Sequence, residues 1–180
     1  MVKRDFDWFL KNNILQRRPF MSKVSPLYLE KARSNLVTMR ILGKILDDTK
    51  VREGLLIPAW YDPSEWIVIT GYYAMYMAGT ALLARVNYRS SNHTATIVAL
   101  EELFVKKKML ERGYLKMLRQ AHLERERLEL LVVARKYREI AQYSVQRTTS
   151  TVIALAQTKN ADAFVRRIEE LLDLLKSSSV

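Results

Sequence analysis

The feature that most constrains this 180-residue chain is a run of nineteen consecutive residues without a charge, from Trp66 to Ala84. As a helix rising about 1.5 Å per residue, such a run reaches nearly across the hydrocarbon core of a bilayer. It is therefore either a membrane span or the most buried helix of a soluble domain. Tyr72, Tyr73 and Tyr76 lie inside the run rather than at its ends, where an aromatic belt belongs. The sequence therefore favours a buried helix.

Composition agrees with a soluble chain. Hydrophobic residues make up 49% of the sequence and charged residues 27%, which supplies enough apolar side chains for one domain with a sizeable core. Because the chain has only five glycines and four prolines, we expect long regular elements rather than many turns. Residues 1–8 include two aspartates and lack the apolar stretch of a signal peptide. We therefore expect a cytoplasmic protein.

The sequence lacks the residues that several classes of catalytic and metal-binding site require. The chain has no cysteine, which excludes disulfides, thiolate catalysis and thiolate metal sites. Its two histidines, His93 and His122, stand 29 positions apart, so we expect no metal site built on histidine. The five glycines are isolated, and no glycine-rich phosphate loop occurs. We therefore expect no metal and no cofactor.

Positive charge is concentrated in residues 104–140. The whole chain carries a formal net charge of +11, and this stretch alone holds eleven Lys and Arg against five Glu, a surplus of six. Its basic residues are Lys106, Lys107, Lys108, Arg112, Lys116, Arg119, Arg125, Arg127, Arg135, Lys136 and Arg138. Such a helix favours phosphate-rich partners through counterion release, but the ion-paired face of a solvated helix has the same composition. Charge alone leaves both interpretations open.

Apolar periodicity predicts an all-α chain. The expected helices cover about 26–49, 63–85, 91–104 and 113–141, and a last amphipathic helix follows a break at 143–150. In that last helix one face is shared by Val165, Ile168, Leu171, Leu172 and Leu175. Residues 1–24 form a separate aromatic and basic arm before a bundle domain at 25–180. The arm can cover the bundle, extend a dimer interface or touch RNA.

Three start signals support these boundaries. Ser25 precedes a proline, which predicts Ser25 as the cap of the first long helix. Asp62 precedes Pro-Ser-Glu, which predicts Asp62 as a cap and Glu65 reaching back to it. The stretch at 87–91 has a turn-like composition, and Ser91 or Asn92 can cap the third helix.

Three segments carry a resemblance to a known family. The first is Tyr72-Tyr-Ala-Met-Tyr-Met-Ala-Gly-Thr-Ala-Leu-Leu83, followed by Asn92-His93 and Leu100-Glu-Glu-Leu-Phe104. The second is Ala134-Arg-Lys-Tyr-Arg-Glu-Ile-Ala-Gln-Tyr143, and the third is Tyr28-Leu-Glu-Lys-Ala-Arg-Ser-Asn-Leu36. Together they resemble the HEPN domains, particularly the small prokaryotic ones, over about residues 26–177. Met77 stands where many relatives have histidine.

The resemblance implies an up-and-down bundle of four to five helices that pairs about a twofold axis. A strip of small residues in the uncharged run supports close packing, whether inside one chain or between two: Gly71, Ala74, Ala78 and Ala81. The resemblance also implies RNA or nucleotide binding. It further implies a small nucleotidyltransferase as the partner in a toxin–antitoxin type system, with Tyr143 as a possible acceptor of a nucleotidyl group.

The resemblance directs attention to Arg138 and Tyr143. HEPN ribonucleases are described by an Arg followed a few residues later by His, which together cleave RNA without a metal. Here Tyr143 replaces that histidine, and a phenol with a pKa near 10 is a weak base at neutral pH. Arg138 can still bind a phosphate, and Tyr143 can stack on a base. The competing interpretation is that Arg138 pairs with a carboxylate and Tyr143 caps the helix end.

His93 is the third candidate catalytic residue. In the first turn of the third helix, the helix dipole keeps His93 neutral and able to act near a phosphate. Alternatively, His93 holds its turn together by hydrogen bonding. The candidate phosphate-binding residues are Arg89, Arg135, Lys136 and Arg138. We expect His122 to be a surface residue.

Three functions follow from these observations. The first is a non-enzymatic HEPN-like module that binds RNA or nucleotide. The alternative is an active metal-independent ribonuclease toxin that uses Arg138 with His93 or Tyr143. The second alternative is a structural dimer without a ligand.

Overall fold

The computed structural model describes residues 5–138 and 151–177, with side chains through residue 128 and again from residue 151. Helix accounts for 78% of the residues, which confirms the predicted helical class, and the chain also forms one small two-stranded sheet. The elements are α1 (Phe6–Lys11), β1 (Leu15–Arg17), the 3-10 helix η1 (Met21–Val24), α2 (Ser25–Asp47), α3 (Thr49–Gly54), α4 (Ser64–Arg85), β2 (Tyr88–Ser90), α5 (His93–Leu100), the π-helical turn η2 (Glu101–Val105), α6 (Arg112–Arg138) and α7 (Thr151–Ser177).

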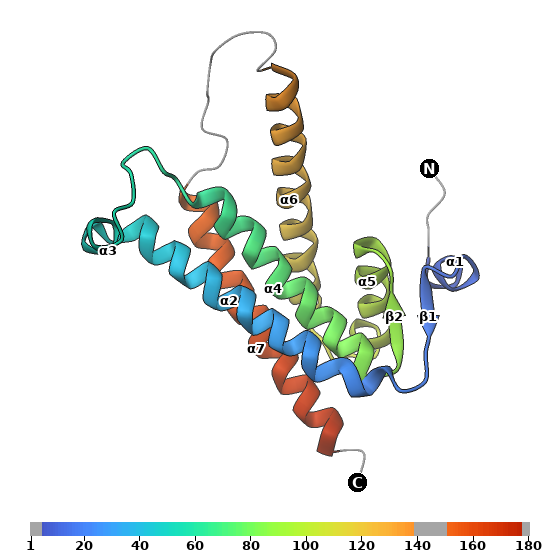
Figure 1. Ribbon diagram of the computed structural model, residues 1–180. Coiled ribbons are helices and arrows are strands. Elements are labelled where there is room, and N and C mark those ends of the chain that lie inside the picture. Colours follow the sequence, from blue (N-terminus) through green and yellow to red (C-terminus); the bar gives the residue numbers. More distant parts are fainter. Residues whose placement is uncertain (1–4, 139–150, 178–180) are drawn as a thin grey trace.

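Helix α4 is the centre of the molecule. Figure 1 shows α2 and α7 beside it as two further long helices, while α6 stands on its other side. At one end of this arrangement lie α5, α1 and the β1–β2 pair, and α3 lies at the opposite end (Figure 1). Every long helix thus contacts α4, which explains why the uncharged segment had to be apolar over most of its circumference.

The uncharged run behaves as a core helix. By length and composition α4 could cross a membrane, but 72% of its most apolar window is buried inside the bundle. A soluble protein's central helix has these properties, because such a helix faces neighbours on all sides. Tyr72 and Met75, in the middle of the run, are fully buried.

The small-residue strip of α4 is used within the chain. Ala74, Ala78 and Ala81 are fully buried. A Cβ atom added at Gly71 would lie 2.9 Å from Gln157 Cγ of α7 and 3.1 Å from Met39 Sδ of α2. The strip therefore lets α2 and α7 approach α4 closely, and it is not an exposed surface for a second copy.

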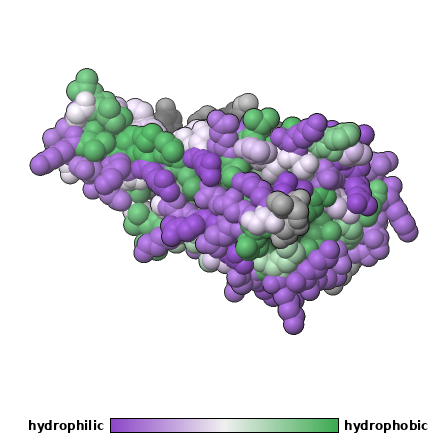
Figure 2. Space-filling view, turned by 90° about the horizontal axis from the view of Figure 1, so that it is seen from below, coloured by the Kyte–Doolittle hydropathy of each residue, from purple (hydrophilic) through white to green (hydrophobic). Residues whose placement is uncertain are grey.

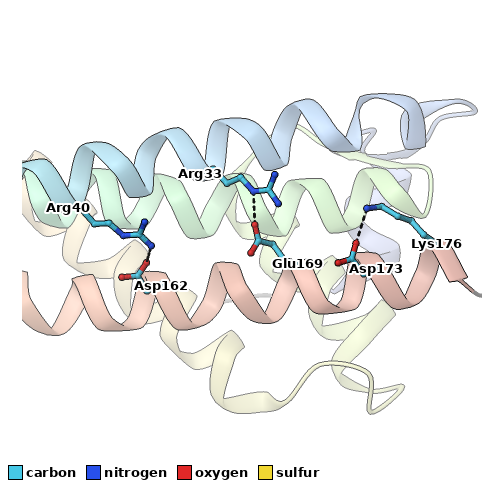
Figure 3. A network of polar contacts seen from close by, with 6 residues as sticks. All are labelled: Arg33, Arg40, Asp162, Glu169, Asp173 and Lys176. Atoms are coloured by element: carbon cyan, nitrogen blue, oxygen red, sulfur yellow. Dashed lines mark hydrogen bonds and ion pairs between the residues drawn. The ribbon is translucent and has the colours of Figure 1, made fainter.

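Ion pairs line the edge between α2 and α7 (Figure 3). Arg33 Nε lies 2.7 Å from Glu169 Oε1, and Arg40 Nη2 lies 2.5 Å from Asp162 Oδ1. Both arginines are largely exposed to solvent, so each pair contributes at most about 1 kcal/mol. The pairs fix the order of the two helices more than they stabilise the fold. The buried face of α7 confirms the prediction for Val165, Ile168, Leu171 and Leu172, while Leu175 is half-buried.

The predicted start signals differ in outcome. Asn92 Oδ1 accepts from the Ala95 amide at 2.8 Å, so the predicted cap of α5 is confirmed. Asp62 Oδ1 accepts from the Ser64 amide at 3.0 Å, but the cap position of α4 is Pro63, so the prediction of Asp62 as the cap was wrong by one residue. The prediction for Ser25 was wrong. Its hydroxyl instead donates to the Ala81 carbonyl at 2.8 Å, because this end of α2 is buried against α4. Helix α6 begins at Arg112, slightly before the predicted start at 113.

The N-terminal arm packs on the bundle. β1 pairs antiparallel with β2, with Leu15 opposite Ser90 and Arg17 opposite Tyr88. Phe9 and Leu15 are buried in the common core. Of the three roles left open for the arm, covering the bundle is the one this packing supports. The turn-like stretch at 87–91 contains a strand because the arm supplies its partner, while the domain boundary after residue 24 stays a prediction.

The hydropathy of the surface differs between the two ends of the molecule. Figure 2 shows a hydrophobic patch at the end of the molecule where Figure 1 places α3. The large apolar side chains exposed in and after α3 are Leu55, Leu56 and Trp60. The opposite end, with β1 and β2, carries mainly hydrophilic surface in this view (Figure 2).

Candidate functional site

Both histidines of the chain meet at the junction of α4, α5 and α6. The ring centroids of His93 on α5 and His122 on α6 lie 5.3 Å apart, and the rings are nearly parallel at 22°. Tyr72 of α4 stacks on His122 at 5.6 Å, and Tyr76 packs against His93 at 4.3 Å. With Arg125 these four side chains make up what we call the histidine cluster.

A hydrogen bond joins Tyr72 to His93. The tyrosine hydroxyl contacts Nδ1 of the imidazole, while Nη1 of Arg125 lies 3.4 Å from Nε2 of the same ring. A guanidinium can only donate, so Nε2 must accept, and a neutral imidazole then carries its proton on Nδ1. His93 therefore donates to the Tyr72 oxygen in this arrangement. These two contacts favour the tautomer of His93 that carries its proton on Nδ1.

The guanidinium of Arg125 lies over two aromatic rings. Its guanidinium carbon lies 5.4 Å from the centroid of Tyr72 and 5.5 Å from that of Tyr73. Cation–π contacts of this length orient the planar fork and limit its rotamers. A guanidinium held in this way loses less entropy when it binds a phosphate in bidentate fashion.

The cluster keeps Tyr72 neutral. Burial raises the pKa of the Tyr72 hydroxyl above its usual range, and the charge of Arg125 only partly opposes that shift. The neighbouring Tyr76 raises the pKa further, because two phenolates would repel one another. Tyr72 is therefore a hydrogen-bonding group of the cluster and not a base at neutral pH.

The expectation that His122 is a surface residue was wrong. Its side chain is 14% exposed, and Nε2 lies 3.3 Å from Oε1 of Glu126, one turn along α6. The Nδ1 atom is buried and has no hydrogen-bond partner in the described part of the chain. Such an atom marks a polar position inside the fold that a ligand or water can satisfy. The signal was available in the sequence, because His122 lies four residues after Leu118, on the buried side of α6.

Local structure explains how α5 presents His93. Asn92 caps the helix, so His93 is its first residue, and the positive end of the helix dipole lies beside the imidazole. Pairing of β2 with β1 fixes the chain just before this cap. The π-helical turn at Glu101–Val105 follows α5, and its Glu101 carboxylate forms an ion pair with Arg119 of α6. α5 and α6 are thereby linked beside the cluster.

The other predicted site residues lie outside this cluster or outside the described structure. Arg89 is an exposed residue of β2 and pairs in register with Gln16. The backbone of Arg135, Lys136 and Arg138 forms the last turns of α6, but their side chains are not among those described. Tyr143 lies in residues 139–150, which the structure does not describe. Only His93 of the predicted set is therefore placed in the cluster.

The cluster offers groups for phosphate chemistry rather than for metal binding. Among the side chains that the structure describes, at residues 5–128 and 151–177, no three His, Asp or Glu gather in a way that could hold a metal ion. The guanidinium of Arg125 can neutralise phosphate charge, and imidazoles can move protons at neutral pH. No family model matches the sequence, and no curated protein is significantly similar to it.

Proposed function

We propose that this chain is a HEPN-like module that binds RNA or a nucleotide, with the histidine cluster as the site that receives a phosphate. The observation that carries the proposal is the guanidinium of Arg125, oriented by two tyrosine rings and next to His93. Planar cations held in this way suit phosphate oxygens, and the half-buried rings of Tyr73 and Tyr76 nearby suit a base.

Charge and sequence pattern support the same proposal. The described part of α6 carries exposed basic residues near the cluster, among them Lys116 and Arg119. The three segments that resemble HEPN domains include α4 and the start of α5, which supply Tyr72 and His93. We extend the proposal to a homodimer with an up-and-down bundle in each subunit. The partner we propose is a small nucleotidyltransferase in a cytoplasmic toxin–antitoxin type system.

A second candidate function is metal-independent cleavage of RNA. The observation that favours it is the pair of imidazoles with centroids 5.3 Å apart, since one can accept a proton from the ribose hydroxyl while the other donates one to the leaving oxygen. Nε2 of His122 contacts Glu126, and both nitrogens of His93 have contacts inside the cluster. Cleavage therefore requires these contacts to open, which is why binding is the primary proposal.

The test compares Arg125→Ala with Arg127→Ala in the presence of EDTA. Arg127 is an exposed arginine two positions further along the same helix, so it controls for loss of one positive charge. Binding of a labelled RNA and of a mononucleotide is measured by fluorescence anisotropy and competition. We expect Arg125→Ala to weaken binding at least about tenfold, as for a charge-assisted contact of about 1.5 kcal/mol or more, and Arg127→Ala to change it little. Arg125→Lys should recover only part of the loss, because lysine keeps the charge without the fork.

Cleavage is measured in the same samples with His93→Ala, His122→Ala, Arg138→Ala and Tyr143→Phe. RNA cleavage that persists in EDTA and is lost in either histidine variant would establish the ribonuclease over the binding module. Loss in Arg138→Ala or Tyr143→Phe alone would place the chemistry at the end of α6 instead. If wild type neither binds nor cleaves, the second alternative, a structural dimer, remains.

A further inference from the structure

Acidic residues are absent from the two segments that meet at the β1–β2 end of the molecule. Residues 8–29 and 66–100 contain no Asp or Glu. They are joined by the β1–β2 pairing and by contacts of η1 with α4. Their cations are Lys11, Arg17, Arg18, Lys23, Arg85 and Arg89, and all but Arg85 are exposed. The nearest acidic residues along the arm are Asp5 and Asp7, and Asp5 is engaged in capping α1.

The turn at residues 17–23, which we call the arm turn, is fixed in shape by Asn87. The Asn87 carbonyl accepts from the Arg18 amide at 2.8 Å, and its side-chain Oδ1 accepts from the Ser22 amide at 3.2 Å. Asn87 itself has a left-handed backbone, with φ of 63°, which asparagine tolerates better than most residues. The arm turn is therefore a preorganised structure and not a loose terminus.

Phe20 is displayed at the tip of the arm turn. Its side chain is among the most exposed large apolar groups, at 72%, and its backbone is also left-handed, with φ of 68°. This conformation is rare for a bulky residue and is retained where surrounding contacts impose it. The Lys23 ammonium lies 5.1 Å from the ring centroid, so the aromatic face is already paired with a cation. The turn thus combines an exposed aromatic ring with positive charge.

A surface hollow of about 390 Å³ adjoins the arm turn, and Arg17, Pro19 and Asn87 line it. Proteins that bind single-stranded nucleic acid combine a groove beside positive charges with exposed aromatic rings on which bases stack, and here Arg17 and Arg18 supply the charges and Phe20 the ring. A duplex hides its bases, whereas an unpaired strand can place one on Phe20 and its phosphates on the arginines.

We propose that the arm turn, together with Arg89, is a second binding surface that holds the backbone of a single-stranded RNA. The inference rests on the proposed function, because it supplies the strand that the histidine cluster receives. Only two residues separate the end of β2 at Ser90 from His93, so a strand anchored at the arm turn has a short path to the cluster. An RNA strand can contact the arm turn and the histidine cluster at the same time, whereas a mononucleotide is too small to reach both.

The experiment measures binding of a fluorescent 2′-O-methyl RNA of about twelve nucleotides, which resists cleavage through its 2′ position. The variants are Arg17→Ala with Arg18→Ala, and Phe20→Ala. The matched control is Lys44→Ala with Lys50→Ala, which removes two exposed lysines at the α3 end. We expect the double arginine variant to lower the steepness of the plot of log K against log salt concentration by about 1.4, because each lost phosphate contact removes about 0.7 from the slope. Phe20→Ala should weaken binding about fivefold or more. Competition by uridine monophosphate should be unchanged in all these variants.

The outcomes separate the two proposals. If the arm variants change RNA binding no more than the lysine control does, the second surface is wrong while the histidine cluster can still stand. If the arm variants weaken RNA binding but Arg125→Ala does not, the second surface stands and the proposed role of the cluster fails. If wild type does not bind the oligonucleotide, both proposals are overturned. Circular dichroism melting of each variant checks that its fold is intact.

Discussion

The two sides of α4 differ in the kind of side chain that they present to the neighbouring helices. Toward α2 and α7, α4 presents Gly71, Ala74 and Ala78, and the contacts there are close and mostly apolar, with the buried side-chain amide of Gln157 as a polar exception. Toward α5 and α6 it presents Tyr72 and Tyr76, whose neighbours include both histidines of the chain and Arg125. We call these the apolar side and the polar side.

The difference shows which part of the fold is needed for stability alone. On the apolar side, apolar substitutions that conserve the side-chain volume usually cost less than about 1.5 kcal/mol. On the polar side, donors and acceptors must match in position, and each unmatched group is costly. The histidine cluster lies on the polar side, which is why our proposal places binding there.

The largest effect should come from opening the apolar side. Met39 is fully buried on α2, with its sulfur near Gly71. We expect Met39→Ala to lower the free energy of unfolding by about 2–5 kcal/mol, through lost burial and a cavity. Urea denaturation measures that loss. Under conditions where the variant remains folded, RNA affinity should equal that of wild type. An equal drop in affinity would show that the two sides are not separable.

A pair of glycines tests close packing on the same side. Gly71→Ala places a methyl group against Gln157 and Met39, whereas Gly43→Ala on α2 meets nothing within 4 Å. Alanine in an open helical position stabilises by up to about 1 kcal/mol. We therefore expect Gly43→Ala to gain stability and Gly71→Ala to be less stable than it by about 1–3 kcal/mol. Equal melting temperatures for the two variants would contradict tight packing at Gly71.

Alkaline pH tests the polar side. The pKa of Tyr72 is raised in the folded state, mainly by burial, above the ordinary tyrosine value near 10. The raised pKa means that its contribution to stability is complete below about pH 10 and is lost as the pH rises further. Tyr72→Phe should remove this part of the alkaline loss, while at pH 7 it costs about 1–3 kcal/mol, since His93 loses its acceptor. Urea midpoints between pH 8 and about 11 measure both effects.

The prediction for Tyr72 is contradicted if wild type and Tyr72→Phe lose the same amount of unfolding free energy as the pH rises above 10. That outcome would mean that the tyrosine hydroxyl is solvated and that the cluster is open in solution. Ultraviolet titration gives an independent reading, because Tyr72 should ionise only when the protein unfolds.

The smallest effect concerns the edge where the two sides meet. Arg167 of α7 binds Glu111 at 2.8 Å and the Met109 carbonyl at 3.0 Å, just before α6. The hydrogen bond from Arg167 lowers the pKa of Glu111. The ion pair therefore stabilises the folded protein at pH values above the ordinary glutamate pKa of about 4.3. This stabilisation is lost as the pH falls through the lowered pKa of Glu111 in the folded state. We expect Glu111→Gln to cost no more than about 1 kcal/mol at pH 7 because the carboxylate is exposed. The difference from wild type should vanish in acid, and a difference that persists at pH 2 would contradict this assignment.

The sequence predicted the apolar side well and the polar side only in part. Periodicity of Leu, Val and Ala reports burial directly, so the faces of α4 and α7 were accessible from the sequence. His122 was interpreted as solvated, although its position four residues after Leu118 indicated the buried side of α6. The role of Arg125 stayed open because charge alone does not separate a phosphate-binding helix from a solvated one, and the packing of α6 on α4 places Arg125 in the cluster. β1 and β2 were missed because each has three residues, and a strand that short depends on a partner far away in the chain.

The placement of RNA binding at the histidine cluster can be tested most directly because the chain has only two histidines. A long-range ¹H–¹⁵N spectrum of the imidazoles therefore reports on the histidine cluster and on no other part of the protein. We predict that free His93 shows the neutral tautomer protonated at Nδ1. We also predict that adding RNA in EDTA shifts the signals of both rings in wild type and in Arg127→Ala, but not in Arg125→Ala. RNA that binds while both imidazoles keep their signals would contradict the assignment of function to the polar side of α4.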